Sequence, residues 1–319
     1  MTYAQGGLIQ AVDYNTFAQG GASPDNNVAN INTIWGVGTG DKGWGQTTTI
    51  TPVSAAATVT ATQWATLFTR FTSSASQTNT TVTAVTNPVV GNTIDFKTNF
   101  STNLSSVFTN RNNAAGVGTT TTTNGVATRS TAWATSLTAT HTITFSSANA
   151  MRYFFNGGGR ITWAGARSGG SVNDKNTSWT NLLTACGTLN WTTGTSTQTI
   201  AGTSYTGTTK TGGSGTPSVL QTGVGFYDYL TTDQEVFKQF SSAYLYTVNF
   251  VSINVKVNAL PGSATVMTLT VLFSDVEADP EENVDGTLTS TITAVAPSTT
   301  YLTEASWGTP TLASSITGS

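Results

Sequence analysis

Apolar side chains recur at helical spacing mainly in the first third of the chain. Between residues 61 and 76, large apolar side chains fall at positions i, i+3, i+4 and i+7, which predicts an amphipathic helix. This stripe consists of Trp64, Leu67, Phe68 and Phe71. A second stripe predicts a helix from about 92 to 110, and we expect the two helices to pack as a hairpin.

Two shorter helices and a glycine-rich loop are predicted before this hairpin. Asp13 is expected to cap a short helix, and 30–35 is expected to form another helical turn. The glycine-rich loop 36–45 lacks the lysine and serine or threonine of a P-loop and the strand–helix context of a dinucleotide site. We therefore interpret it as a tight structural turn, followed by a strand-like run at 46–52.

Most of the remaining chain alternates polar and apolar positions with the period of a β-strand. Strands are predicted at 141–146, 160–164, 245–258, 265–275 and 287–295. One helix is expected among them, at 176–186, with Cys186 on its inward face. Long strands in series are typical of an antiparallel β-sandwich. We predict a mainly β fold, with an N-terminal docking part at 1–115 that holds the glycine-rich loop and two helices, and an antiparallel β-sandwich domain at 116–319.

Composition narrows the classes of function. The chain has 319 residues, of which 37% are hydrophobic and only 8% charged, and its net charge is −3. This balance argues against disorder and against nucleic-acid binding, because no basic surface is available to neutralise phosphates. No apolar run approaches the length of a membrane span, so membrane insertion is not expected. Weak charge and a threonine content of about a fifth suit a subunit whose surface is covered by neighbours.

Residues for catalysis are scarce. His141 is the only histidine and Cys186 the only cysteine, so the chain can form neither an internal disulfide nor a His/Cys zinc site. No nucleophile motif lies near His141, which is predicted to be a surface or cross-strand residue. Cys186 is predicted to be a buried apolar side chain. We expect no enzyme activity and no cofactor.

One loop concentrates negative charge. Its candidate ligands for a cation are Asp275, Glu277, Asp279 and Asp285. The loop departs from the EF-hand pattern, because Pro280 and Gly286 stand where the turn glycine and the bidentate glutamate should be. A solvated hairpin tip is the preferred interpretation.

Aromatic residues in irregular segments are candidates for contacts with another chain. Residues 1–50 are rich in glycine and asparagine yet carry many large apolar side chains, so this segment is expected to dock onto a neighbour. The run at 153–155 cannot place three rings on one face of a strand. The predicted interface residues are Tyr14, Phe17, Trp35, Trp44, Tyr153, Phe154 and Phe155. The alternative is that these side chains cover the domain's own core.

Several short blocks resemble virion structural proteins of tailed phages, in particular cyanophages. The blocks occur in the same order along most of the chain, and each is weak alone. They are 7–15, 30–36, 43–46, 152–161, 223–231, the strand pair that ends at Asp275, and 284–288.

The resemblance implies a non-enzymatic virion protein, assembled in the host cytoplasm, that contacts copies of itself in a trimer or ring and other virion structural proteins. A tail-associated place, as tail fibre, baseplate or neck appendage, is the first expectation. A head decoration or cement protein is one alternative. A carbohydrate-binding adhesin that recognises a host surface glycan is another.

Overall fold

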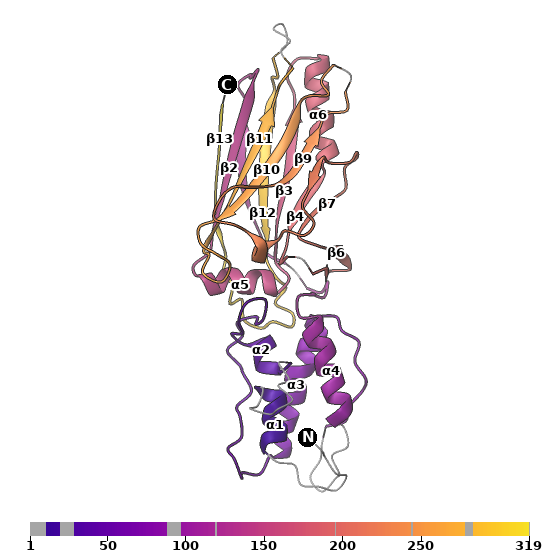
Figure 1. Ribbon diagram of the computed structural model, residues 1–319, viewed down its shortest axis with the longest axis vertical. Helices are drawn as coiled ribbons and strands as arrows, with labels where there is room; N and C mark the ends of the chain where they lie inside the picture. The colour runs from indigo at the N-terminus through magenta and orange to yellow at the C-terminus, as the bar shows by residue number, and fades with distance from the viewer. Residues whose placement is uncertain are drawn as a thin grey trace.

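The structure is a computed structural model. It describes residues 11–19, 29–87, 97–118, 120–194, 196–243, 245–277 and 283–318. The molecule is elongated, with four helices at one end and antiparallel sheets along the rest of its length (Figure 1). The fold is mainly β, as predicted.

The helical end contains α1 (Ala11–Ala18), α2 (Ile31–Trp35), α3 (Ala61–Gln77) and α4 (Lys97–Thr109). The periodicity placed α3 correctly, and its start is fixed by a capping box. The Thr60 hydroxyl accepts from the Gln63 backbone N–H at 3.2 Å, and the Gln63 side chain accepts from the Thr60 N–H at 2.7 Å. Asp13 lies inside α1 rather than capping it, which corrects that prediction. Residues 92–96 of the second predicted helix lie outside the described residues.

Aromatic rings fill the space between these helices. Tyr14 packs edge-on against Trp64 with ring centroids 5.3 Å apart. Phe100 of α4 contacts Phe17 and Phe68, each at 4.9 Å. Such ring pairs add about 0.5–1.5 kcal/mol each beyond the burial of their area. The stripes read from the sequence therefore face one another in a shared core.

Two large antiparallel sheets form the other end. One has the order β1-β12-β3-β4-β7 and the other the order β13-β2-β11-β10-β9-β8, and β5 and β6 form a separate hairpin. The strands are β1 (Thr122–Arg129), β2 (Ser136–Thr144), β3 (Arg160–Ser168), β4 (Thr188–Trp191), β5 (Gln198–Ile200), β6 (Thr203–Tyr205), β7 (Thr208–Thr211), β8 (Val219–Leu220), β9 (Gln234–Phe240), β10 (Phe250–Val257), β11 (Val266–Ser274), β12 (Thr287–Val295) and β13 (Thr311–Gly318).

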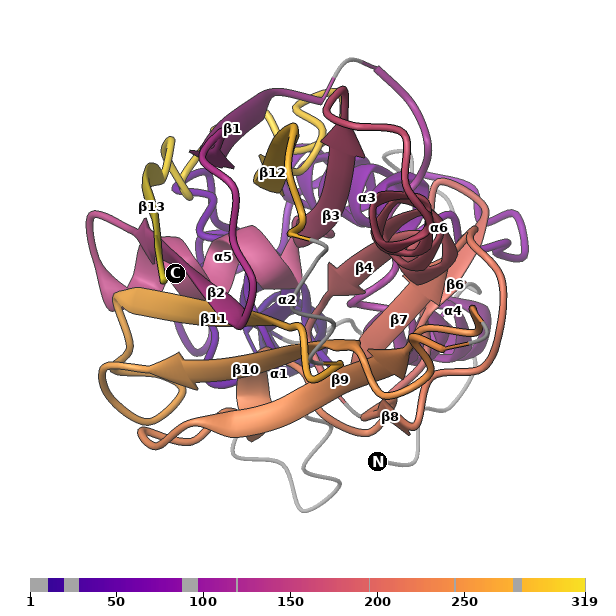
Figure 2. The ribbon, with the colours of Figure 1, turned by 90° about the horizontal axis from the view of Figure 1, so that it is seen from above.

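The two sheets pack face to face (Figure 2). In β2 and β11 every second side chain is buried, while threonines dominate the outward positions. Trp163 of β3 reaches Phe273 of β11 across the layers, with centroids 6.4 Å apart. Alternation with period two therefore identified most of the long strands. The run 46–52 forms no strand, which corrects the expectation for that segment.

Two helices belong to the sandwich end. The predicted helix at 176–186 is α6 (Asp174–Cys186), which packs against β3, β9 and β10 and closes one side of the sandwich (Figure 2). The aromatic run at 153–155 lies in α5 (Ala148–Asn156), which covers the end of the sandwich nearest the other helices (Figure 1). Its treatment as strand was wrong, because Ser147 caps a helix there by accepting from the Ala150 N–H.

Candidate functional site

The glycine-rich loop 36–45 lies where the helical end meets the sandwich end, and we call this region the joint. Its path depends on glycine at two positions. Gly43 has φ 87°, and a Cβ there would lie 2.2 Å from the Val37 carbonyl oxygen. Gly45 has φ 70°, and a Cβ there would lie 2.2 Å from the Tyr153 ring. The loop is therefore the tight structural turn that was predicted, pressed directly against α5.

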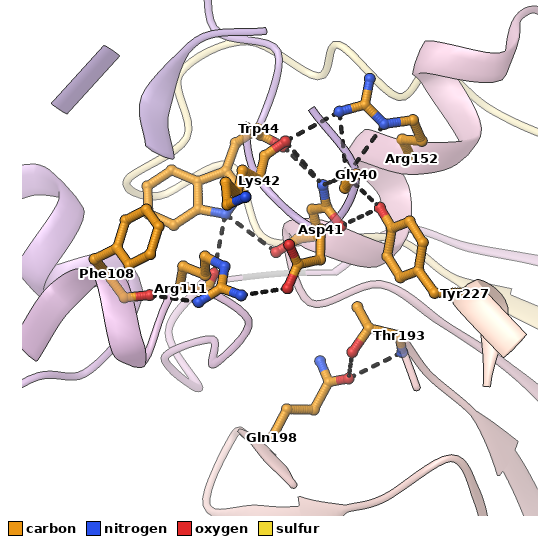
Figure 3. Close-up of polar contacts among 12 residues, drawn as sticks. Gly40, Asp41, Lys42, Trp44, Phe108, Arg111, Arg152, Thr193, Gln198 and Tyr227 are labelled. Carbon is orange, nitrogen blue, oxygen red and sulfur yellow. Dashed lines mark hydrogen bonds and ion pairs between the residues drawn. The ribbon is translucent and has the colours of Figure 1, made fainter. Parts of the chain in front are cut away.

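Arg152 of α5 binds the carbonyl oxygens of this loop (Figure 3). Its guanidinium donates to Gly40 at 3.1 Å, to Lys42 at 3.1 Å and to Val37 at 3.4 Å. A further N–H donates to the side chain of Asn149 at 2.8 Å. The side chain is buried, so its charge is satisfied mostly by main-chain dipoles of the loop.

Asn156, at the end of α5, binds the same loop. Its amide N–H₂ lies 3.2 Å from the Lys42 oxygen and 3.1 Å from the Gly43 oxygen. The Tyr227 hydroxyl lies 2.6 Å from the Gly40 oxygen and 2.8 Å from the Asn156 Oδ1. Burial raises the pKa of Tyr227, so the hydroxyl stays protonated and can donate to either acceptor.

Trp44 connects the loop to both ends of the molecule. Its indole N–H lies 3.1 Å from the main-chain oxygen of Asn156, at the end of α5. It lies 3.2 Å from the main-chain oxygen of Arg111, just after α4. Arg111 in turn pairs with Asp41 and lies over the Phe108 ring at 4.8 Å (Figure 3). One polar network therefore holds together the helical end, the glycine-rich loop and the sandwich end.

A pocket of about 280 Å³ opens beside the joint. Its described lining is Asp41, Asn112, Thr193, Gly194, Ser196, Tyr227 and Asp228. Asp228 accepts from the Gly225 N–H at 3.1 Å, and the Thr193 hydroxyl donates to Gln198 at 2.6 Å. The lining offers oxygen acceptors and hydroxyls, with no lysine or arginine among these residues.

The predicted interface residues pack inside the chain. All seven side chains, from Tyr14 to Phe155, are at most 7% exposed. Trp35 and Trp44 pack against each other at 6.1 Å, and Phe154 packs on Phe145 at 5.2 Å. The prediction that they contact another chain is therefore corrected. They form the core of the helical end and of the joint. The alternative, that they cover the domain's own core, is the one observed.

The acidic loop does not assemble a cation site from its described residues. Asp275 is fully buried and pairs with Lys175 at 2.8 Å, while Lys175 also donates to the Glu277 main-chain oxygen. Asp285 accepts from the Ser171 hydroxyl at 2.7 Å and from its N–H at 3.0 Å. These bonds, together with Arg167 and Asn176, lower the pKa of Asp285.

Asp275 and Asp285 are therefore not available as cation ligands, whereas the carboxylate of Glu277 stays an untested candidate. Protein donors already occupy the carboxylates of Asp275 and Asp285, and no group of three metal-binding side chains is found among the described residues. The fourth candidate, Asp279, lies outside them.

His141 is buried between the sheets, so its expected surface position is wrong and its cross-strand position is right. One ring nitrogen lies 2.8 Å from the Ser314 hydroxyl on the neighbouring strand, and the other lies 2.8 Å from Ser290 on the facing sheet. Ser290 also accepts from the Trp163 indole N–H at 2.8 Å. Burial lowers the pKa of His141 to about 4, so the ring is neutral at pH 7.

Cys186 is buried as well, and burial raises the pKa of its thiol to about 12. A buried thiol with this pKa is not a nucleophile at neutral pH. Neither Cys186 nor His141 lines the pocket beside the joint.

Comparisons with family models, with curated proteins and with solved structures find no match for this chain. Within the described residues, no helix has both the length and the apolar character needed to cross a bilayer. The joint residues Arg152, Asn156 and Tyr227 were not singled out from the sequence. The available signal was that they fall within the blocks of the phage resemblance.

Proposed function

We propose that the chain is a non-enzymatic structural subunit of a tailed-phage virion, associated with the tail as a fibre, baseplate or neck appendage. The observation that carries the proposal is the joint. Blocks 43–46, 152–161 and 223–231, which carry the resemblance, are far apart in sequence and are hydrogen-bonded to one another there. Because the residues of these blocks hold the fold together, the resemblance to virion proteins supports a common architecture and not a common reaction.

The joint also supports a mechanical role. A buried network of hydrogen bonds to main-chain oxygens holds the helical end against the sandwich end. An elongated molecule with such a joint can act as one stiff unit. The buried positions of His141 and Cys186 favour a role without catalysis.

Contacts with neighbouring copies are part of the proposal. The outward rows of the second sheet are uncharged across β13, β2 and β11, where Thr140 pairs with Thr270 and Thr142 with Thr268. Such a face can pack against another protein without the cost of desolvating charge. We therefore expect a trimer or ring within the particle.

Locating the chain in purified particles tests the proposal. Particles of the phage that encodes it are labelled with antibodies against the sandwich and imaged by electron microscopy. Label on the tail or neck supports the tail assignment, and label confined to the head favours a decoration protein. Absence of the chain from purified particles, measured by mass spectrometry, would contradict a virion role.

The non-enzymatic part has its own test. Purified protein is incubated with host envelope polysaccharide and with peptidoglycan, and soluble fragments are measured. We expect no release. Release that is abolished by substituting two neighbouring carboxylates would show an enzyme instead.

A further inference from the structure

Three polar residues meet in the interior of the sandwich end, on the side that α6 closes. They are Lys175, near the start of α6, Asn249, directly before β10, and Asp275, directly after β11. None of the three is more than 6% exposed. We propose that the side chains of Lys175 and Asn249 become joined by an amide bond, with Asp275 as the group that transfers the protons. This inference does not rest on the virion assignment, because it follows from the cluster alone.

Asn249 presents an activated amide carbon. Its side-chain oxygen accepts from two main-chain N–H groups, that of Val276 at 2.8 Å and that of Glu277 at 3.0 Å. Two fixed N–H donors on a carbonyl oxygen stabilise the negative charge that develops when a nucleophile attacks the carbon. The amide nitrogen donates to Asp275 at 2.6 Å, so the leaving group already contacts an acid that can protonate it.

Lys175 places an amine against the same carboxylate. Its Nζ lies 2.8 Å from the Asp275 oxygen that Asn249 does not contact. Nζ also donates to the main-chain oxygen of Glu277 at 3.2 Å, and the N–H of Glu277 binds Asn249. The amine and the amide therefore flank one carboxylate and share one main-chain neighbour. Holding two reactants together in this way removes the entropy cost of bringing a free amine to an amide in water.

The reaction balances without any further reactant. The Lys175 ammonium gives a proton to the Asp275 carboxylate, and the neutral amine attacks Cγ of Asn249. The bond from Nζ to Cγ forms and the bond from Cγ to Nδ2 breaks. Asp275 gives its proton to Nδ2, which leaves as ammonia, and takes a second proton from Nζ. The chain reacts once with itself, and the product links α6 covalently to the segment before β10.

Apolar rings surround this cluster. Trp179, one turn after Lys175 on α6, faces Asp275 and packs against Trp133 at 4.8 Å and Phe273 at 6.5 Å. Burial raises the pKa of Asp275, which favours the neutral acid that the reaction needs, and a dry site protects the new amide from hydrolysis. The ion pair is the state before reaction, so stability measured on chains that have not reacted reports the pair alone.

Mass spectrometry of the full chain tests the inference. Folded protein is incubated at neutral pH, and its intact mass is followed after denaturation. We expect a growing fraction of chains that have lost one ammonia. Protease digestion and tandem mass spectrometry should then find a branched peptide that joins Lys175 to Asn249.

Three variants identify the groups that react. Lys175→Arg keeps the positive charge, but its guanidinium stays protonated and cannot attack, so the mass should stay that of its sequence. Asp275→Asn cannot transfer the protons and should slow the loss roughly 100-fold or more. The matched control Lys256→Arg, in an exposed pair with Asp233, should lose ammonia at the rate of the unsubstituted chain.

Three outcomes would overturn the inference. One is an unsubstituted folded chain that keeps the mass of its sequence through the whole incubation. A second is ammonia loss that persists in Lys175→Arg, as cyclisation of an asparagine before glycine, such as Asn124, would produce. A third is loss of water with a peptide that joins Lys175 to Asp275. If the variants fail to fold, the unsubstituted chain decides, because the branched peptide identifies the two joined residues.

Discussion

Replacing Lys175 by methionine should destabilise the protein far more than an ordinary loss of charge. The ammonium group lies 2.8 Å from Asp275, and the two side chains are 1% and 0% exposed. Asn249 donates to the other Asp275 oxygen at 2.6 Å and remains in the variant. Without Lys175, the carboxylate is buried with only neutral side chains to donate to it, so we expect a loss of about 3–5 kcal/mol in the free energy of unfolding.

The same chain offers a matched control. Lys256 pairs with Asp233 at 3.2 Å, with side chains 39% and 53% exposed. Water screens this pair, and Lys256→Met should change the free energy of unfolding by less than about 1 kcal/mol. Urea unfolding followed by circular dichroism measures both variants, and an unchanged slope against urea shows that the unfolded states are comparable.

The pH dependence of the stability lost in Lys175→Met gives a second check. Burial raises the pKa of Asp275 in the folded chain, whereas Lys175 and Asn249 lower it. Removing Lys175 should raise this pKa further, so mild acid protonates the carboxylate and reduces the destabilisation. Replacing Asp275 by leucine as well should recover most of the loss. Equal effects of Lys175→Met and Lys256→Met at neutral pH would refute the reasoning.

Three further predictions concern the other buried groups. The pKa of His141 is about 4 in the folded chain against 6.5 in the unfolded chain, so this residue adds no pH dependence to the stability above pH 6.5. As the pH drops to 4, the unfolded chain binds the proton first, and the free energy of unfolding falls by up to about 3 kcal/mol. His141→Gln should flatten this part of the curve of stability against pH. Gly45→Ala should cost about 3 kcal/mol because its Cβ meets the Tyr153 ring, whereas Gly40→Ala, with φ 58° and no atom within 4 Å, should cost about 1 kcal/mol; equal losses in urea unfolding would contradict the contact. Cys186 should react with iodoacetamide only at the rate of unfolding, as mass spectrometry can measure, and rapid labelling of folded protein would show that the thiol is accessible.

Local periodicity explains what the sequence could predict. α3 has one apolar face and a polar face of threonines, so its pattern is visible without knowledge of its neighbours. β2 and β11 likewise alternate because one face of each is buried. α5 was missed although Asn149, Arg152 and Asn156 mark a polar face at helical spacing. From Ala150 to Asn156 every residue is buried, because this polar face binds the glycine-rich loop instead of water.

The joint lay beyond pattern analysis because its acceptors are main-chain oxygens. Nothing in the identity of Gly40 or Lys42 shows that a carbonyl group there faces Arg152, more than a hundred positions away. The acidic loop was misjudged for a related reason. Its carboxylates resemble free ligands in sequence, but Lys175 and Ser171 approach them from the segment around the start of α6.

These buried partners change the meaning of the low charge content. Arg152 and Lys175 are 6% and 1% exposed, and Arg70 lies over the Trp35 ring at 4.2 Å. Several of the 12 basic residues therefore act inside the fold, between segments distant in sequence, rather than at the surface. The surface of the molecule is consequently even less charged than the composition indicates. A surface of this kind gains little from long-range electrostatic attraction, so its contacts with neighbouring copies would depend on shape and on close packing of threonine side chains.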